Sequence, residues 1–339
     1  MNETKKDSIL PKLLARQSKN SVKVPSRNSK IGFAFSTKNR VELSRRTLKT
    51  LDTEKGFDIL WLDGSDTEEG KRFPSEYVFK KARLKDICFG VTGGPDRCIQ
   101  FGLEKLLDMG YDYCGLIEND LLFKPGWFNA LIKTYSYAAR EGLVVGSATV
   151  RSYNSRVIEY RKNYSINWNT GAGMVLFSRK GAEIVLDNYP EDLKKRLPII
   201  TRKLIKFYGE NFGIDISSND EWKGAFEGHL IHEMRLGPDH TYEKALYEHG
   251  LSTIGSIPNF VIDTGVDVKR ILHTRYVNRK DSGRGLIFPK MSSSYLAWVT
   301  LTEPILYPTI ETLRRLGVLK YRKRLLFGEE KLISSYRVE

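Results

Sequence analysis

Two carboxylates stand at the end of an apolar stretch near the middle of the chain. Residues 111–117, YDYCGLI, predict a strand, and Glu118, Asn119 and Asp120 follow it directly before the sequence becomes apolar again. A buried strand would carry both carboxylates to the rim of a sheet, where Mg²⁺ binds one or two carboxylates together with substrate phosphates. A charged strand end that faces water is the other interpretation, and the triplet alone does not decide between them.

Apolar runs alternate with helical patterns along most of the chain. The expected strands cover residues 31–36, 57–62, 87–91, 111–117, 143–150, 171–178 and 252–262. The expected helices cover residues 40–51, 95–109, 127–140, 179–186, 191–207, 220–236 and 239–249. Strands that alternate with helices in this way predict an α/β fold with a parallel sheet.

Ligands of such sheets bind beyond the carboxyl ends of the strands. Polar residues follow four of the expected strands, at 36–39, 63–66, 93–97 and 118–120. We therefore expect four loops to converge on one crevice. Residues 151–169 are basic and aromatic, and we expect them to form an ordered, partly mobile loop region over that crevice.

The composition is that of a globular protein with a basic surface. The 339 residues include 55 Lys and Arg against 41 Asp and Glu, a net charge of +14. This balance favours anionic partners such as nucleotides, acidic polymers or anionic lipid surfaces. Cys88, Cys98 and Cys114 lie in apolar surroundings without a C-x-x-C spacing, so we predict reduced core residues. With no signal-peptide pattern, we expect a cytoplasmic location.

The sequence pattern divides the chain into three parts. Residues 1–29 predict a basic, poorly ordered tail, residues 30–275 a folded α/β domain, and residues 276–339 a basic helical extension. The extension suits either packing on the domain or peripheral contact with the inner face of an anionic membrane. Its most apolar stretch, 296–310, contains a Glu and two Pro and is too short for a membrane span, which needs about 18 apolar residues.

The order of these signals resembles the GT-A type nucleotide-sugar glycosyltransferases, most closely their family-2 group. Residues 36–40, STKNR, resemble the Thr-Tyr-Asn-Arg-like turn after the family's first strand, with Lys38 in the aromatic position. Residues 62–66, LDGSD, resemble its Asp-Asp-Gly-Ser-x-Asp motif, with Leu62 in place of the first Asp. Residues 92–102 are a weaker version of its third loop and helix, and residues 118–120 correspond to its Asp-x-Asp metal motif. The resemblance covers about residues 30–273.

The resemblance implies a GT-A fold, that is, a Rossmann-like mixed sheet flanked by helices, with a nucleotide-diphosphate site at the strand ends. It implies that Asp63 accepts hydrogen bonds from the base or ribose, although a turn-forming Asp before Gly is the other interpretation. Asp120, with Glu118 at longer reach, would hold Mn²⁺ or Mg²⁺ against the diphosphate. The implied nucleotide-binding residues are Ser36, Thr37, Asn39, Arg40, Asp63, Gly94, Arg97 and Asn119.

An inverting transfer also needs a general base. In the family this is the Asp of a Glu-Asp pair that opens a helix ending in Gly, which implies Asp239 here, with Pro238 in the position of the Glu. The same two residues also suit an ordinary helix N-terminus. Asp220 and Glu221 are the alternatives for the base. His273 stands where several members of the family place a third metal ligand.

The resemblance therefore implies a metal-dependent glycosyltransferase of polysaccharide biosynthesis. It would move a sugar, with inversion, from a nucleotide-diphosphate sugar to a hydroxyl of a glycan or lipid-linked glycan. The departures at residues 62, 118 and 238 favour an alternative, a non-catalytic nucleotide-sugar or glycan-binding protein on a degenerate transferase scaffold. A sugar nucleotidyltransferase is disfavoured because residues 36–40 contain no glycine. No nucleic-acid partner is expected.

Overall fold

The computed structural model of the chain describes residues 14–15, 22–26, 28–151, 157–168, 170–171, 173–189, 206, 210 and 238–263. The first half of these residues forms β1 (Ile31–Thr37), α2 (Val41–Leu51), β2 (Asp58–Asp63), α3 (Glu68–Glu76), β3 (Arg83–Phe89), α4 (Pro95–Asp108), β4 (Tyr113–Glu118), β5 (Leu121–Phe123) and α5 (Trp127–Arg140). The second half forms β6 (Val145–Thr149), β7 (Val157–Tyr160), β8 (Tyr164–Asn167), β9 (Met174–Ser178), α6 (Arg179–Asp187), α9 (Pro238–Glu248), β10 (Ser252–Ser256) and β11 (Val261–Asp263).

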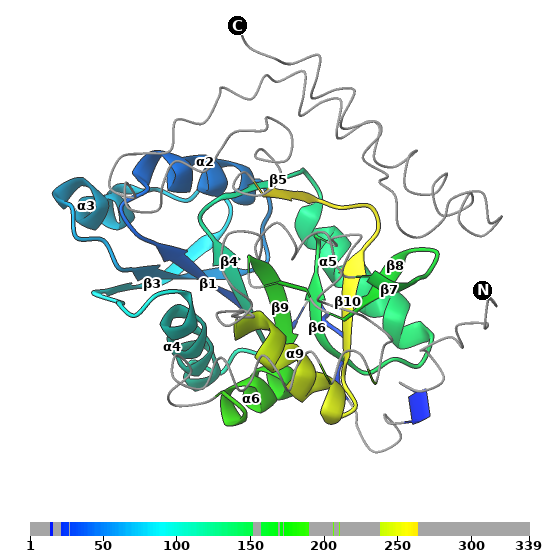
Figure 1. The fold of residues 1–339 in the computed structure, drawn as a ribbon. Helices are drawn as coiled ribbons and strands as arrows, with labels where there is room; N and C mark the ends of the chain where they lie inside the picture. Colours follow the sequence, from blue (N-terminus) through cyan, green and yellow to red (C-terminus); the bar gives the residue numbers. More distant parts are fainter. Residues whose placement is uncertain are drawn as a thin grey trace, which may run out of the picture.

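A mixed sheet organises the described part of the chain, with nine strands in the order β3-β2-β1-β4-β9-β6-β10-β8-β7 (Figure 1). The first four strands run parallel to one another. β9 is antiparallel to both of its neighbours, β4 and β6, while β10 is parallel to β6. β5 and β11 pair separately as a small antiparallel sheet. The α/β fold and the mixed sheet that the resemblance implies are confirmed. The parallel sheet predicted from the alternation of strands and helices is correct for β1 to β4, whose carboxyl ends share one edge, but not for β7, β8 and β9, which pair antiparallel.

Helices cover both faces of this sheet. Figure 1 shows α2, α3 and α5 on one face and α4, α6 and α9 on the other. The strand β2, next to the edge strand β3, is buried at each of its residues, as a parallel strand covered on both faces must be. Alternate side chains of β2 lie in two apolar layers, one on each face of the sheet. Trp61 contacts Phe35 and Phe73 in the layer that also contains the buried side chains of α2, α3 and α5. Leu60 and Leu62 belong to the layer that contains the buried side chains of α4, α6 and α9.

The expectation of a loop over residues 151–169 is wrong for much of that range. Residues 157–160 and 164–167 form β7 and β8, an antiparallel hairpin that extends the main sheet beside β10. The basic residues Arg161 and Lys162 lie in the turn, which the Arg161 amide closes by donating to the Tyr164 carbonyl (2.8 Å). The pairing with β10, nearly 90 residues further on, is a tertiary contact that the local composition does not reveal.

The edge strand β3 also differs from its prediction. The sequence predicts a strand over residues 87–91, whereas β3 covers Arg83–Phe89. Its register with β2 shifts so that Lys85 is an extra residue between the partners of Ile59 and Leu60. Such a bulge interrupts the alternation of apolar and polar residues from which a strand is predicted. Two short elements, α3 and β5, were not predicted, and the single strand predicted over residues 252–262 is two strands, β10 and β11, which belong to different sheets.

Several expectations concern residues outside the described ranges. These are the helices predicted over residues 191–207 and 220–236 and the extension at 276–339. Between residues 190 and 237 the structure describes only residues 206 and 210. Part of the predicted N-terminal tail is described, and the Lys23 carbonyl accepts a hydrogen bond from the Tyr113 hydroxyl. The three cysteines are free, as predicted, with Cys114 buried. Within the described ranges, no helix has the length and apolar character needed to cross a membrane.

Candidate functional site

Asp63 lies at the centre of the shared strand edge and is almost completely buried (1% exposed). One of its carboxylate oxygens, Oδ1, accepts hydrogen bonds from Thr37 Oγ1 (3.0 Å) and Ser65 Oγ (2.7 Å). The Thr37 hydroxyl in turn accepts from the Trp61 indole N–H (2.8 Å). Among the described residues, no hydrogen bond reaches Oδ2. The carboxylate is therefore held rigidly through one oxygen, and its second oxygen keeps its capacity to accept.

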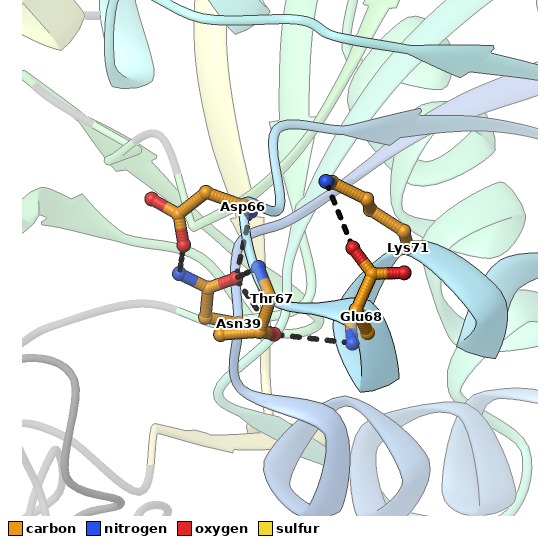
Figure 2. Close-up of polar contacts among 6 residues, drawn as sticks. Asn39, Asp66, Thr67, Glu68 and Lys71 are labelled. Atoms are coloured by element: carbon orange, nitrogen blue, oxygen red, sulfur yellow. Dashed lines mark hydrogen bonds and ion pairs between the residues drawn. The ribbon is translucent and has the colours of Figure 1, made fainter.

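Asn39 joins the loop after β1 to the loop after β2 (Figure 2). Its side-chain oxygen accepts from the amides of Asp66 (2.9 Å) and Thr67 (3.1 Å) and from the Thr67 hydroxyl (3.1 Å). Its side-chain nitrogen donates to the Asp66 carboxylate. Asn39 has a positive φ of 54°, a conformation that asparagine adopts more readily than most residues. Asn39 thus shapes the predicted nucleotide site from within, and its contact with a ligand stays a prediction.

Gly64 packs the β2 loop against the loop after β3. Its amide donates to the Thr37 carbonyl, and the Val91 amide donates to the Asp63 carbonyl, both at 3.0 Å. A Cβ at Gly64 would lie 2.4 Å from the Val91 carbonyl oxygen, so only glycine fits this approach. Three strand ends are in this way joined around Asp63, as the sequence predicted for the loops at 36–39 and 63–66.

The loop after β3 leads into α4 through glycines. Gly93 and Gly94 have positive φ values of 108° and 82°, and Gly94 caps α4, which begins at Pro95 as predicted. In the part of the chain that the structure describes, a Cβ at Gly94 would meet nothing within 4 Å, so no described residue fills the space beside this helix start. Arg97, in the first turn of α4, is exposed, and its guanidinium carbon lies 5.5 Å from the centre of the Phe101 ring.

The acidic triplet divides between two sides of the sheet edge. Glu118 is half-buried at the end of β4, where its amide donates to the Gly173 carbonyl (2.8 Å). A Cβ at Gly173 would lie 3.4 Å from Glu118 Oε2, so the carboxylate packs against a glycine. Asn119 is buried and turns toward α2, donating to Ser44 Oγ (3.0 Å). Asp120 is half-buried in the turn before β5.

Asn119 therefore has an observed structural role. Its carbonyl also accepts from the Thr47 hydroxyl (2.9 Å), so both its backbone and its amide fix the turn to α2. The Asn119 carbonyl and side-chain amide therefore bond to α2 and not to Asp63. Within the described ranges no three His, Cys, Asp or Glu side chains gather as a metal cluster. His273 lies outside those ranges, so its contribution to a metal site remains untested.

A second buried carboxylate, Glu243, lies on α9 and was not predicted. It is 3% exposed, and its Oε1 accepts from the Thr170 amide (3.0 Å) and the Thr170 hydroxyl. Its Oε2 accepts from the Thr253 hydroxyl on β10 (2.5 Å). Glu243 thereby ties α9 to β10 and to the segment that leads into Gly173, where Glu118 packs.

The predicted general bases lie at or beyond the limits of the described residues. The backbone of Asp239 forms the start of α9, as predicted, four residues or about one helical turn before Glu243. Asp220 and Glu221 lie outside the described ranges. The remaining predicted contacts, Ser36 and Arg40, flank the Thr37 to Asn39 turn, with Ser36 half-buried and Arg40 exposed.

Reactive thiols do not contribute a nucleophile to this region. Burial raises the pKa of the Cys88 thiol on β3, with a further rise from Asp86 that Lys105 partly offsets. A raised pKa keeps the sulfur protonated at neutral pH, and the thiolate is the nucleophilic form. The chemistry that the described side chains suit is hydrogen bonding and charge stabilisation by oxygen groups.

Sequence reasoning missed three contributors to the site. Ser65 and Thr67 bind Asp63 and Asn39, and their position in the run after β2 was the available signal, because short hydroxyl residues commonly bond to nearby loop groups. Glu243 had no comparable signal. Its partners at residues 170 and 253 come from other parts of the chain, and a Glu in a helix is ordinarily exposed.

Comparison with known structures found distant neighbours. S. aureus TarS (residues 1–349) matches with 10% sequence identity and a TM-score of 0.41, over 70% of this chain and 61% of that chain. The apo form of the glycosyltransferase GlyE of Streptococcus pneumoniae TIGR4 matches with 14% identity and a TM-score of 0.34, over 67% of this chain and 45% of that chain. The chain thus spans 61% and 45% of these two structures. No family model matches it, and no curated protein was found to be similar.

Proposed function

We propose that this chain is a metal-dependent glycosyltransferase of the GT-A type. It would transfer a sugar from a nucleotide-diphosphate sugar to a hydroxyl of a glycan or lipid-linked glycan, with inversion. The observation that carries the proposal is the buried Asp63 carboxylate. It is held through Oδ1 by Thr37 and Ser65, and it has an accepting oxygen left at the carboxyl edge of four parallel strands. Ligands of α/β sheets bind at this edge.

The nucleotide would lie across the strand ends in this proposal. Asp63 Oδ2 would accept a hydrogen bond from the base or the ribose. The diphosphate would lie toward the start of α4, because helix N-termini favour negative charge and no described residue lies within 4 Å of a Cβ built at Gly94. Arg97 is an exposed cation on the first turn of this helix and would add to that charge stabilisation.

The acidic triplet supplies donors of the right chemistry for Mn²⁺ or Mg²⁺. Asp120 and Glu118 offer carboxylate oxygens on either side of one turn, and two carboxylates together with phosphate oxygens are a sufficient donor set for Mg²⁺. A bound cation would supply Lewis-acid neutralisation of the charge on the departing nucleotide diphosphate. Asp120 is the main proposed ligand, because Glu118 packs against Gly173 on the α4 side of the sheet.

The acceptor hydroxyl would lose its proton to Asp239 at the start of α9. A general base must reach that hydroxyl within hydrogen-bond distance, directly or through one water. Glu243, one turn later, fixes α9 to β10 and to Thr170, so it would hold this helix in place during the transfer. We propose Glu243 as a positioning residue and not as a second base, because its carboxylate is engaged by these donors.

Calorimetry tests the proposal without knowledge of the acceptor. The full chain is titrated with UDP, GDP, ADP and CDP, each with and without Mn²⁺, and wild type is compared with Asp120→Asn. We expect one nucleoside diphosphate to bind only with Mn²⁺, and we expect the variant to lose about tenfold or more of that affinity, since charge-assisted contacts contribute about 1.5–3 kcal/mol. Glu76→Gln, an exposed change at the end of α3, is the matched control.

The outcomes separate the two functional classes. Metal-dependent binding accompanied by slow hydrolysis of the matching nucleotide-sugar supports a transferase. Metal-dependent binding without hydrolysis or transfer to any hydroxyl acceptor favours a binding protein on a transferase scaffold. If no nucleoside diphosphate binds with Mn²⁺ present, the proposed function is wrong.

A further inference from the structure

Phe89 is an exposed aromatic residue beside the buried Asp63. Its side chain is 54% exposed, whereas the other aromatic side chains that the structure describes are buried or half-buried. Exposure of a large ring without a partner loses the free energy that its burial would provide, about 1.5–3 kcal/mol. A single exposed apolar residue is common on protein surfaces, so what matters for a role in binding is where Phe89 lies relative to the polar site.

The sheet register places Phe89 in one row with the site. Thr37 pairs with Asp63, and Asp63 pairs with Phe89, across the parallel strands β1, β2 and β3. Side chains of register partners on neighbouring strands point to the same face, and neighbouring strands are about 4.8 Å apart. The Phe89 ring and the Asp63 carboxylate are therefore neighbours on the face that carries α2 and α3.

Among the described residues, none fills the space beside Gly90, the residue that follows Phe89. β3 is the edge strand of the sheet, and it ends at Phe89, directly before Gly90, which has a positive φ of 72°. A Cβ added at Gly90 would meet nothing within 4 Å. The Phe89 ring is 54% exposed and so offers a flat apolar surface to a ligand, while the residue below it on the same face, Ile87, packs on the core.

The turn after β1 supplies no aromatic surface of its own. Residue 38 in that turn is a lysine, and it is exposed. A planar ligand held by the Asp63 carboxylate along one edge needs a flat apolar surface for its face, because hydrogen bonds at the edge alone do not orient the ring. Phe89 is the one aromatic residue in the row that Thr37 and Asp63 define.

We propose that Phe89 stacks on the nucleobase of the donor nucleotide. The inference rests on the proposed function and identifies the residue that would recognise the flat face of the base, with Asp63 Oδ2 accepting from its edge or from the ribose. Stacking on an aromatic side chain stabilises any base, because every base has a π-face. Phe89 would thus contribute affinity, and the choice among bases would depend on the hydrogen-bonding groups.

The test separates the base from the phosphates. The full chain is titrated by calorimetry with the same four nucleoside diphosphates and with inorganic pyrophosphate, all with Mn²⁺, in wild type, Phe89→Ala and Phe89→Tyr. We expect Phe89→Ala to weaken the best-bound nucleoside diphosphate about tenfold and to leave pyrophosphate unchanged. Phe89→Tyr keeps the ring and should bind as wild type does. Val78→Ala, at an equally apolar and 80% exposed position, is the control.

A second measurement detects the stacked geometry directly. In the wild-type complex, the base protons should shift upfield in the NMR spectrum through the ring current of Phe89, and Phe89→Leu, which keeps apolar bulk, should abolish that shift. If wild type binds a nucleoside diphosphate and Phe89→Ala binds it equally well, the stacking inference alone is wrong. If wild type binds no nucleoside diphosphate, the proposed function fails first and this inference fails with it.

Discussion

At the scale of single residues, the site depends on how side chains divide their hydrogen-bonding groups. Asp63 uses Oδ1 for Thr37 and Ser65, Asn39 uses both ends of its amide for the next loop, and Asn119 uses its amide for Ser44. Buried polar groups must be satisfied in this way, because an unpaired one costs about 1–3 kcal/mol. Residues of the same polar type in the same motif therefore differ in whether they remain available to a ligand.

Asp63→Asn should weaken nucleotide binding while leaving the fold intact. The retained oxygen can still accept from Thr37 and Ser65, but an N–H₂ group would replace Oδ2 and could only donate. We expect an affinity loss of about tenfold to a hundredfold for the best-bound nucleoside diphosphate by calorimetry. Asp86→Asn, an exposed change of the same charge on β3, should have no effect. Equal binding by both variants would exclude Asp63 from the nucleotide site.

At the scale of elements, glycines and buried carboxylates hold the strand ends and helices together. Gly64 allows the loops after β2 and β3 to approach each other, and Glu243 connects α9 with β10 and with the segment before β9. The neighbours that these residues contact are distant in sequence. The elements themselves form from local patterns, but their relative placement depends on these few contacts.

Gly64→Ala should displace the loop after β3 and so distort the site around Asp63. The new Cβ would lie 2.4 Å from a backbone carbonyl, which cannot rotate away as a side chain could, so the loop at residues 90–94 must shift. Such overpacking costs about 1–3 kcal/mol, measurable as a lower urea midpoint. Nucleoside diphosphate affinity should fall with it. Thr92→Ala, an exposed change in the same loop, is the control, and an unchanged midpoint for Gly64→Ala would contradict the observed approach.

Glu243→Gln should destabilise the protein more than the same change at Glu248. At residue 243 the substitution places an N–H₂ group among the donors from Thr170 and Thr253, and we expect a loss of about 1–3 kcal/mol in the free energy of unfolding. Glu248 is an exposed residue of the same helix that pairs with Lys244 at 2.5 Å, and surface pairs contribute little. Equal urea midpoints for the two variants would argue against a fixing role for Glu243.

At the scale of the whole molecule, buried tyrosines make stability depend on alkaline pH. Burial raises the pKa of Tyr77 to about 12, with Asp52 adding to the rise and Arg45 opposing it. Burial also raises the pKa of Tyr111, Tyr113, Tyr135 and Tyr164. A free tyrosine has a pKa of about 10. The folded protein therefore keeps these phenols protonated at pH values where the unfolded chain releases their protons.

The stabilisation that these tyrosines provide should consequently be fully present below about pH 10. It should decrease as the pH rises from about 10 toward 12, because the folded-state pKa values lie above the unfolded ones. Urea unfolding at pH 8 and at pH 10.5 measures the difference. Tyr77→Phe removes one of the groups, so the difference between the two pH values should be smaller in this variant. An identical pH dependence in wild type and Tyr77→Phe would show that Tyr77 does not contribute.

Much of the fold followed from patterns that are local in the sequence. The strand at 31–36, the helix at 127–140 and the helix that begins at Pro95 were predicted at or within a residue of their observed limits, because apolar periodicity and start signals act over a few residues. The hairpin of β7 and β8 was missed, and the bulged β3 was predicted with the wrong limits. Their strand character depends on pairing with β10 and β2, which local composition does not encode.

The sequence by itself determined the polar strand ends and their order, because in a parallel sheet the residues after each strand must meet at one edge. Only the tertiary structure decided which oxygen of Asp63 is engaged, that Asn119 turns toward α2, and that Phe89 lies exposed in the row of Thr37 and Asp63. The physical reason is that the direction and burial of a side chain depend on its neighbours in space. Those neighbours come from strands and helices far apart in the chain.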